Sequence, residues 1–454
     1  MKTINALFSL PLFAVALVAT QNADAAVPVV DNATMTQSDT SRQVTITYTL
    51  VNAPAVVTLD VETNCVVNGE TVWASIGGQA VCNAKGDVWQ KVTGDGTHTI
   101  TWRPDKSWPD HVIGEGGARA VVTAWAMDNT PDYMVVDISA AAQPDTQKYY
   151  PTTDFLPGGL LDNDNYRKTS LVMRKIMAKD VEWTMGSTTL ETRRNAAREA
   201  THKVTLTDNY YIGVFPVTQA QWEILQPTYL APSHFNNAED RAMRPVEKVS
   251  YNEIRNSSTM VANTTYEYPA DPNPDSYLGK LRTRTGLDFD LPSEAQWEFA
   301  ARAGNGDTRW GDGSGILNTD EDANLNRLGR YKANGGYVGG TSEPAQACDA
   351  DNGTSVVGTY APNAWGLYDT FGNVWEWCLD CFAANITANG GAVNTVADSP
   401  VNTANGQSGQ QRSFRGGSWL SSANDCRPAV RSYNPGSWSG KYVGFRLCCN
   451  AGLQ

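Results

Sequence analysis

The chain has 454 residues, of which 41% are hydrophobic and 18% charged, so it is long enough for two domains with apolar cores. Its formal net charge of −13 argues against binding to the phosphate backbone of nucleic acids, and no basic run or basic amphipathic helix indicates binding to a membrane surface. With 39 Gly and 14 Trp, the composition favours tight turns packed on large aromatic side chains over a helical bundle.

The first 25 residues have the pattern of a secretory signal peptide. Lys2 precedes an apolar stretch at 7–19, and Ala23 and Ala25 are small residues at the positions that signal peptidase requires. The stretch is short for a membrane-spanning helix and no charged stop follows it, so an uncleaved anchor is the less favoured alternative. We expect cleavage near Ala25 and a secreted or periplasmic protein, with no membrane segment beyond the signal peptide.

Residues 27–145 predict a small β-sandwich of immunoglobulin-like architecture. Five short runs of β-branched and aromatic residues are separated by turn signals, at 44–50, 55–61, 97–102, 120–125 and 133–138. Many short strands of this kind are typical of two packed sheets. None of the residues in this region indicates catalysis, so we expect a spacer or an accessory binding domain.

Residues 146–168 contain Pro, Gly and Asp without periodicity, which predicts a linker to a second domain at 169–454. Two helices are predicted in that domain, at 218–225 and 293–303. Thr218 and Ser293 are suitable N-caps, and Gln296 completes a capping box with Ser293. The remainder is rich in Gly, Asn and aromatic residues, which predicts an α+β fold with little regular secondary structure.

A series of short motifs follows in order through the second domain. The series is Trp183-Thr184-Met185-Gly186-Ser187, Arg244-Pro245-Val246, Leu291-Pro292-Ser293-Glu294, Gly372-Asn373-Val374-Trp375-Glu376-Trp377, Arg415-Gly416-Gly417-Ser418-Trp419 and Gly444-Phe445-Arg446. Each motif is weak alone, but the ordered set resembles the formylglycine-generating (sulfatase-modifying factor) family. The resemblance implies a fold related to C-type lectins, in agreement with the α+β prediction.

The resemblance also implies an activity. The family oxidises a cysteine of a sulfatase precursor to formylglycine with oxygen and with copper held by two thiolates. Its copper positions correspond to Ser421 and Cys426 here, and Ser418 and Trp375 correspond to residues that line its active cleft. A serine hydroxyl is a hard, protonated ligand that replaces a thiolate poorly on Cu(I), so the copper mechanism is doubtful in this chain.

The other cysteines leave several alternatives open. A second thiolate could come from elsewhere in the chain, from Cys378, Cys381, Cys448 or Cys449. In an exported protein disulfides are permitted, and Cys65 and Cys82 are close enough in sequence to pair. For Cys426 itself, a buried thiol or a disulfide partner is the favoured interpretation. The chain has four His, which gives little support to a three-histidine iron site.

Calcium is the cofactor that the resemblance favours. It implies two sites, the first with Asp369, Gly372, Val374 and Glu376, the second with Asn324, Leu325, Asp349 and Asp351. Two carboxylates and two backbone carbonyls from one tight loop suit a hard cation that prefers oxygen. The alternative is that Asp369 and Glu376 only cap turns.

Two functions are compatible with these patterns. The first is an exported enzyme-like protein that oxidises or matures a secreted protein or peptide. The second is a non-catalytic, calcium-stabilised module that binds a protein or a ligand on the same fold, and the missing cysteine favours it. Calcium-dependent glycan binding ranks third, because the expected calcium ligands are structural. A fold alone does not decide among these functions.

Overall fold

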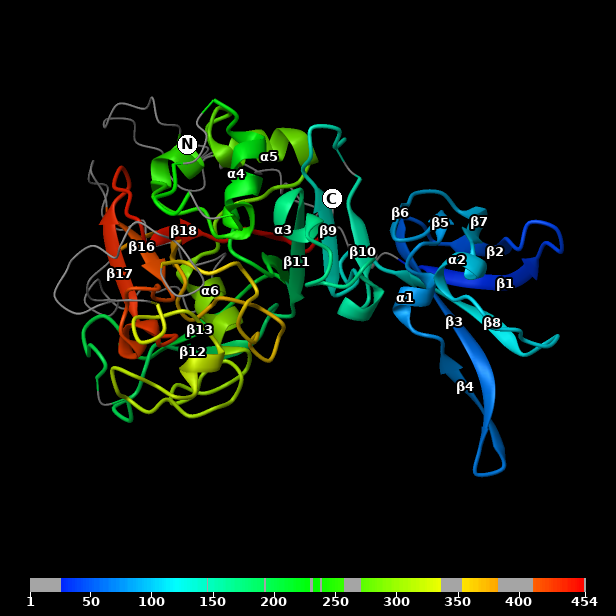
Figure 1. The fold of residues 1–454 in the computed structure, drawn as a ribbon, viewed down its shortest axis with the longest axis horizontal. Coiled ribbons are helices and arrows are strands. Elements are labelled where there is room, and N and C mark those ends of the chain that lie inside the picture. Colours follow the sequence, from blue (N-terminus) through cyan, green and yellow to red (C-terminus); the bar gives the residue numbers. More distant parts are fainter. Residues whose placement is uncertain are drawn as a thin grey trace, which may run out of the picture.

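The computed structural model describes residues 26–144, 146–191, 193–228, 232–236, 239–256, 271–335, 353–382 and 411–452. Figure 1 shows a smaller β lobe at one end, in blue, and a larger lobe at the other. The architecture is α+β with short helices and many short strands, as the sequence predicts. The predicted signal peptide lies outside the described residues. Within them, no helix is both long and apolar enough to cross a bilayer.

The smaller lobe consists of two sheets that enclose one apolar core. One sheet has the order β1 (Val29–Gln37), β2 (Val44–Val51), β7 (Gly96–Trp102), β5 (Lys85–Gly86). The other has the order β4 (Glu70–Ser75), β3 (Ala55–Val67), β6 (Gln90–Val92), with β8 (Ala118–Trp125) also paired to β3. Alternate residues of β2 are buried against β3, so the predicted alternation is correct. The short helices α1 (Gly78–Val81) and α2 (Pro104–Ser107) lie beside the sheets.

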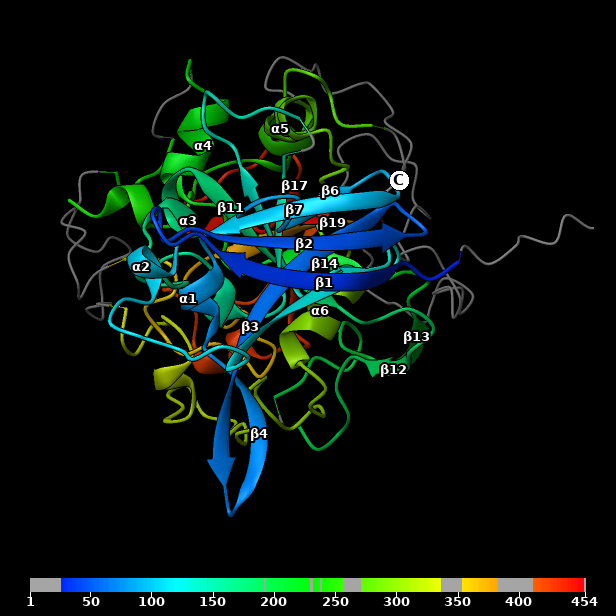
Figure 2. The same cartoon turned by 90° about the vertical axis from the view of Figure 1, so that its right-hand side faces the viewer.

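The end of the β3–β4 hairpin extends away from the smaller lobe as a two-stranded arm, residues 64–73 (Figure 2). β8 pairs with β3 only as far as Thr63, so the arm has no third strand. Several of its side chains are exposed, among them Cys65, Val66 and Val67. The arm is held by hairpin pairing and, at its base, by the Asn64–Gly117 hydrogen bond and the contact of Arg119 with Trp73, and sequence periodicity did not indicate it.

The boundary between the lobes differs from the sequence prediction. The run expected as the last sandwich strand, β9 (Tyr133–Asp137), pairs instead with β10 (Lys148–Tyr150) and β11 (Ser170–Ile176). These strands belong to the central sheet of the larger lobe, in the order β10-β9-β11-β14-β19, with β14 (Tyr210–Gly213) and β19 (Cys448–Asn450). Met134 and Val136 are buried in the core of that lobe, which explains the pairing.

The predicted linker at 146–168 is ordered and packs against both lobes, because β10 joins the central sheet while Leu156 and Tyr166 belong to the apolar cluster of the sandwich. It contains β10, a 3₁₀ turn at Thr153–Phe155 and the start of α3 (Asn165–Lys168). Tyr149, Leu156 and Tyr166 are buried. These apolar side chains fix the segment, although its Pro and Gly content suggested a linker.

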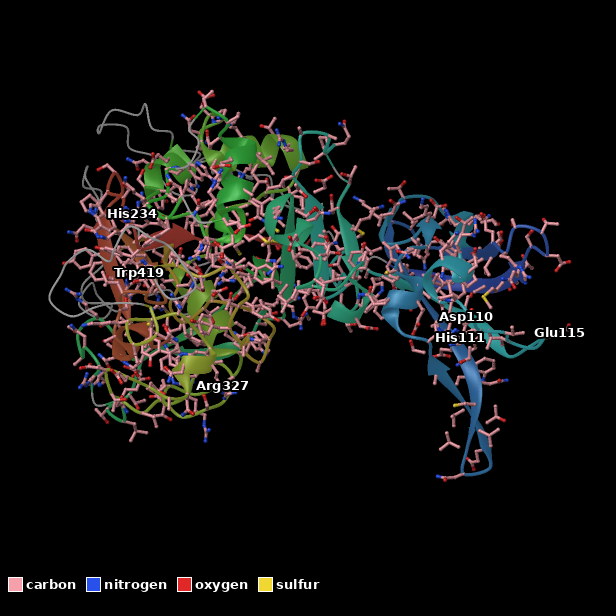
Figure 3. All side chains as sticks on the ribbon, viewed as in Figure 1. Asp110, His111, Glu115, His234, Arg327 and Trp419 are labelled. Carbon is pink, nitrogen blue, oxygen red and sulfur yellow. The ribbon has the colours of Figure 1, made fainter. Side chains whose placement is uncertain are left out.

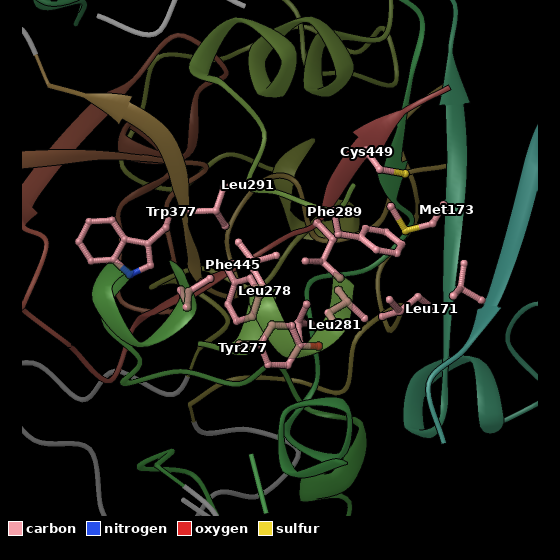
Figure 4. Packing of buried hydrophobic residues seen from close by; sticks show 14 of the residues in the cluster. Leu171, Met173, Tyr277, Leu278, Leu281, Phe289, Leu291, Trp377, Phe445 and Cys449 are labelled. Atoms are coloured by element: carbon pink, nitrogen blue, oxygen red, sulfur yellow. The ribbon is translucent and has the colours of Figure 1, made fainter. Parts of the chain in front are cut away.

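Both helices predicted in the larger lobe are confirmed: α4 (Gln219–Leu225) and α6 (Glu294–Arg302). Each begins with a complete capping box, from Thr218 with Gln221 and from Ser293 with Gln296. The helix α5 (Tyr277–Thr285) was not predicted. Its Tyr277, Leu278 and Leu281 enter the main core beside Phe289 and Phe445 (Figure 4).

The second sheet of the larger lobe positions the candidate site. Its order is β17 (Arg431–Pro435), β16 (Gln411–Arg415), β15 (Trp375–Cys381), β18 (Val443–Phe445), and β15 and β18 are parallel. A separate pair, β12 (Glu182–Met185) and β13 (His202–Thr205), lies near α6. The remaining short turns are η2 (Arg241–Met243), η3 (Asn252–Asn256), η4 (Leu325–Arg327) and η5 (Ala423–Cys426).

Candidate functional site

The Gly416-Gly417 turn after β16 builds the centre of the candidate site. Both glycines have positive φ, 97° and 75°, which only glycine adopts without strain. A Cβ at Gly416 would lie 2.9 Å from the indole of Trp297, and one at Gly417 would overlap the sulfur of Cys426. The turn therefore needs both glycines for its backbone and for the close approach of Cys426.

Three of the four expected active-site residues meet at this turn. The Ser418 backbone N–H donates to Ser421 Oγ at 3.0 Å, and the two hydroxyls are 3.1 Å apart. Cys426, at the end of η5, packs against Gly417. Trp375 is placed elsewhere, in the main apolar core, with its ring edge-on to Phe414 at 5.3 Å.

The thiol of Cys426 is in an apolar setting. It is 0% exposed and packs in a cluster that includes Trp297, Leu325 and Tyr331. Burial raises its pKa far above that of a free thiol, and the Asp425 carboxylate raises it further, while the backbone of Ser418 lowers it slightly. A thiol in this environment stays protonated at neutral pH.

No disulfide joins Cys426 to another cysteine that the structure describes. The seven cysteines that the structure describes are all free, so a Cys65–Cys82 disulfide is not formed, and Cys348 lies outside the described residues. Cys378 packs in the same apolar cluster as Cys426. Burial raises the pKa of Cys378, and its charged neighbours are Glu294, Arg415, Asp380 and Glu376.

Comparison with known proteins identifies the larger lobe. Residues 140–451 match the model of the "Sulfatase-modifying factor enzyme 1-like domain" family, which covers more than half of the chain. The chain belongs to this family. The match begins at residue 140, so β9, which pairs with β11 in the central sheet, precedes the matched segment.

Individual relatives match over shorter segments. A formylglycine-generating enzyme of Streptomyces coelicolor is 37% identical over 169 residues, 36% of this chain and 47% of that protein. The chaperone protein LppX of Paenibacillus barcinonensis is 30% identical over 237 residues, 49% of this chain and 72% of that protein. The chain thus spans about half the length of the curated formylglycine-generating enzymes of Streptomyces coelicolor and Thermomonospora curvata that it matches.

Solved structures match this chain at lower sequence identity. Treponema denticola variable protein 1 has a TM-score of 0.43 and 23% identity, and the match covers 62% of this chain and 96% of that one. PvdO from Pseudomonas aeruginosa has a TM-score of 0.42 and 22% identity, and the match covers 62% of this chain and 94% of that one.

The residues at the family's copper position do not fit copper in this chain. Cu(I) needs soft, deprotonated sulfur ligands. Cys426 and Cys378, which share one apolar cluster, are both buried, protonated thiols, and the Ser421 hydroxyl is hydrogen-bonded to Ser418. No copper step can be derived from this arrangement.

The first set of expected calcium ligands does not fit a cation either, because a guanidinium already lies there. Arg446 donates to both carboxylate oxygens of Glu376, at 2.8 and 3.0 Å, and to the carbonyl of Tyr368. Trp297 Nε1 donates to the same carboxylate at 2.6 Å. The Asp369 oxygens accept from Gly358 N and Asn373 Nδ2.

The pKa of Asp369 agrees with this assignment. Burial, and to a smaller degree the charge of Glu376, raise it to about 6, against the lowering effects of Gly358 and Arg446. This loop is therefore held together by hydrogen bonds and one buried ion pair.

The second set of expected calcium ligands is described only in part. Asp349 and Asp351 lie outside the described residues. Leu325 is buried in the apolar cluster, and Asn324 donates its side-chain amide to the carbonyl of Gly315 at 2.8 Å. Among described residues, no group of three or more His, Cys, Asp or Glu side chains is arranged to hold a metal ion. Calcium at this second set stays a prediction.

A frame of buried ion pairs surrounds the site, and the sequence did not predict it. Glu294 and Glu298, on one face of α6, pair with Arg431 and Arg415 from β17 and β16, and Arg302 pairs with Glu298 at 2.8 Å. Burial would raise the pKa of Glu294, but Arg431 and Arg415 hold it at about 2. The i,i+4 spacing of Glu298 and Arg302 was the one signal available in the sequence.

A second unpredicted feature is the buried acid Glu247. It is 0% exposed, accepts a hydrogen bond from Phe235 N at 2.9 Å, and its Oε2 has no partner within the described residues. Burial raises its pKa to about 8. Phe235 packs edge-on against Trp419 at 5.2 Å, and Figure 3 shows Trp419 and His234 at the end of the larger lobe away from the sandwich.

Proposed function

We propose that this chain is an exported binding module for a secreted protein or peptide, built on the formylglycine-generating-enzyme fold and without the family's copper oxidation. The observation that carries the proposal is the fully buried, protonated thiol of Cys426, whose copper partner position is Ser421. Neither group offers the thiolate that Cu(I) requires.

The frame around this position supports the same proposal. The carboxylates of Glu294, Glu298 and Glu376 are each bound by an arginine, so none is left as a general base near Ser418. Their role is to hold the loops that carry the site. Loops fixed by buried ion pairs in this way can present a constant surface to a partner.

Export supports a partner outside the cytosol. The proposal of a secreted or periplasmic location rests on the signal-peptide pattern of residues 1–25. Sequencing the N-terminus of protein recovered from the medium or the periplasm tests it, since cleavage should leave a chain that begins near residue 26. An intact Met1 on membrane-bound protein would contradict it.

The copper question is tested by titrating the reduced full chain with Cu(I), followed by an oxygen-uptake assay with a cysteine-containing sulfatase peptide. We expect no stoichiometric copper that depends on Cys426 and no oxygen uptake. The exposed thiol Cys65 is the matched control, because Cys65→Ser removes non-specific copper binding without touching the larger lobe. Stoichiometric binding that is lost in Cys426→Ala, with oxygen consumed, would refute the proposal and make the chain an oxidase.

A further inference from the structure

A cavity of about 350 Å³ lies in the larger lobe at the C-terminal end of α6. Its walls come from β12, the segments around Thr188 and Thr201, and the loop 304–307 that follows α6. None of its lining residues belongs to the Ser418–Ser421–Cys426 cluster or to the expected calcium ligands. The volume is near the lower end of the range of small-molecule sites, which suits one ring rather than a chain.

The cavity combines aromatic surface with a few polar groups. Trp183 and Phe299 line it, with their rings 5.4 Å apart, and Phe299 is supported from behind by Trp365 at 5.3 Å. The polar lining includes the hydroxyls of threonines and the side chains of Arg302 and Asp307. Small-molecule sites have this composition, in which apolar walls hold the ligand and a few polar groups orient it.

Two hydrogen-bond donors of the lining are buried without a partner among the described residues. They are Nε1 of Trp183 and Nη1 of Arg302. Arg302 is 4% exposed, and its other donors are used, by Glu298 at 2.8 Å and by the carbonyl of Gly186 at 2.6 Å. A buried donor without an acceptor is unfavourable, so a ligand oxygen that reaches either donor after a small shift of the side chain is favoured.

The charges around the cavity select against an ion. Asp307 accepts a hydrogen bond from the Thr188 backbone at 2.8 Å. Burial raises the pKa of Asp307, but Thr188 and Arg302 lower it by more, so the net shift is downward. Asp307 is therefore a carboxylate at neutral pH. This carboxylate and the partly negative C-terminal end of α6 disfavour an anion. Arg302 disfavours a cation. A neutral ligand with both donors and acceptors satisfies all of these groups.

We infer that this cavity is a binding site for a single neutral sugar ring, with the ring's C–H face on Trp183 and Phe299 and its hydroxyls between Arg302, Trp183 and Asp307. Sugar hydroxyls both donate and accept, which matches the mixture of orphan donors and a carboxylate. Unlike glycan binding through calcium, this site uses no cation. The inference goes beyond the proposed function and holds whether or not the Cys426 region is catalytic.

The test is saturation-transfer NMR on the full chain with glucose, galactose, mannose and N-acetylglucosamine, and with leucine as a zwitterionic probe and acetate as an anionic probe. We expect saturation of the ring protons of at least one sugar, unchanged by EGTA. Trp183→Phe keeps the aromatic wall and removes one donor, so it should weaken binding about two- to tenfold, and Asp307→Asn should weaken it about tenfold or more. Trp73→Phe, on the arm of the smaller lobe, is the matched control and should bind as wild type.

The outcomes separate clearly. Absence of transfer to every sugar, transfer that is equal in wild type and Trp183→Phe, or binding of leucine or acetate alone would overturn the inference. Trp183→Phe decides the matter even where Asp307→Asn is poorly folded, since thermal unfolding of each variant is recorded alongside. None of these readouts depends on copper, so the inference and the proposed function can fail separately.

Discussion

The two lobes of this protein are stabilised in different ways. The smaller lobe buries almost only apolar side chains between its sheets, such as Ile46, Leu50 and Leu59. The larger lobe buries arginines and glutamates as well, and Arg415, Arg446 and Glu298 are 0% exposed. Apolar burial stabilises through area removed from water, whereas each buried charge must be matched by a partner.

This difference determines how each lobe tolerates change. An apolar core can adjust to a lost methyl group, and the cost grows with the cavity that remains. A buried ion pair cannot adjust in this way, because loss of one partner leaves an uncompensated charge in a medium of low dielectric constant. The larger lobe should therefore be the more sensitive to single polar substitutions.

The largest expected effect is that of Arg446→Met. It would leave the Glu376 carboxylate buried without its cation, and the carbonyls of Gly213 and Val214 would lose their donor. We expect a loss of about 3–5 kcal/mol in the free energy of unfolding of the larger lobe, measured by urea denaturation. Adding Glu376→Gln to Arg446→Met should recover part of the loss. A double variant as unstable as the single one would show that the unpaired charge is not the cause.

In the smaller lobe, Leu59→Ala is the comparable core substitution. Leu59 is 1% exposed and lies on β3 within the apolar core. We expect a loss of about 2–5 kcal/mol, because the cavity can only partly collapse. Val66→Ala is the control on the same strand, since Val66 is 72% exposed on the arm and should change stability little. If Leu59→Ala lowered the free energy of unfolding by less than Val66→Ala does, the smaller lobe would not be stabilised by its apolar core as described.

Glu247 provides a pH-dependent test in the larger lobe. Its pKa is about 8 in the folded chain because of burial, partly offset by hydrogen bonds from Phe235 and His234 and by Lys248 and Lys441. The unfolded value is about 4. Between about pH 4 and pH 8 the carboxyl group of Glu247 is protonated in the folded state and ionised in the unfolded state. The stability that Glu247 contributes is therefore fully present below about pH 4 and is lost as the pH rises to about 8.

Glu247→Gln should therefore flatten the fall of stability between about pH 5 and pH 8, because the amide does not titrate. Some slope should remain, since burial and nearby Glu294 raise the pKa of Asp380 to about 8. The measurement is urea denaturation of wild type and variant across this pH range. Parallel pH profiles for the two proteins would show that Glu247 ionises as an ordinary surface carboxylate.

The sequence predicted the parts of the structure that depend on local pattern. The strands of the smaller lobe followed from alternation, and α4 and α6 followed from their capping boxes. The motif series identified the family, and the glycine turn did bring Ser418, Ser421 and Cys426 together. The α+β class of the larger lobe followed from its composition.

The parts that were not predicted depend on long-range contacts. The sequence of β9 fits both the sandwich and the central sheet. Its partner β11, more than thirty residues later in the chain, decides that β9 joins the central sheet. Arg446 and Glu376 are 70 residues apart, so no local pattern reveals that an arginine occupies the expected calcium loop. The cavity beside α6 is likewise assembled from segments that are distant in sequence.

The smallest expected effect is that of Arg119→Met in the smaller lobe. Arg119 pairs with Glu62 at 2.6 Å and covers the ring of Trp73 at 4.5 Å, but its side chain is 52% exposed. An exposed pair of this kind contributes about 0–1 kcal/mol, because water and salt screen it. Urea denaturation of Arg119→Met should therefore show a change several times smaller than that of Arg446→Met, and the small change should shrink further in high salt. A loss as large as that of Arg446→Met would mean that the arm contributes to the stability of the whole lobe, and the contrast between an apolar and an ion-paired lobe would no longer hold.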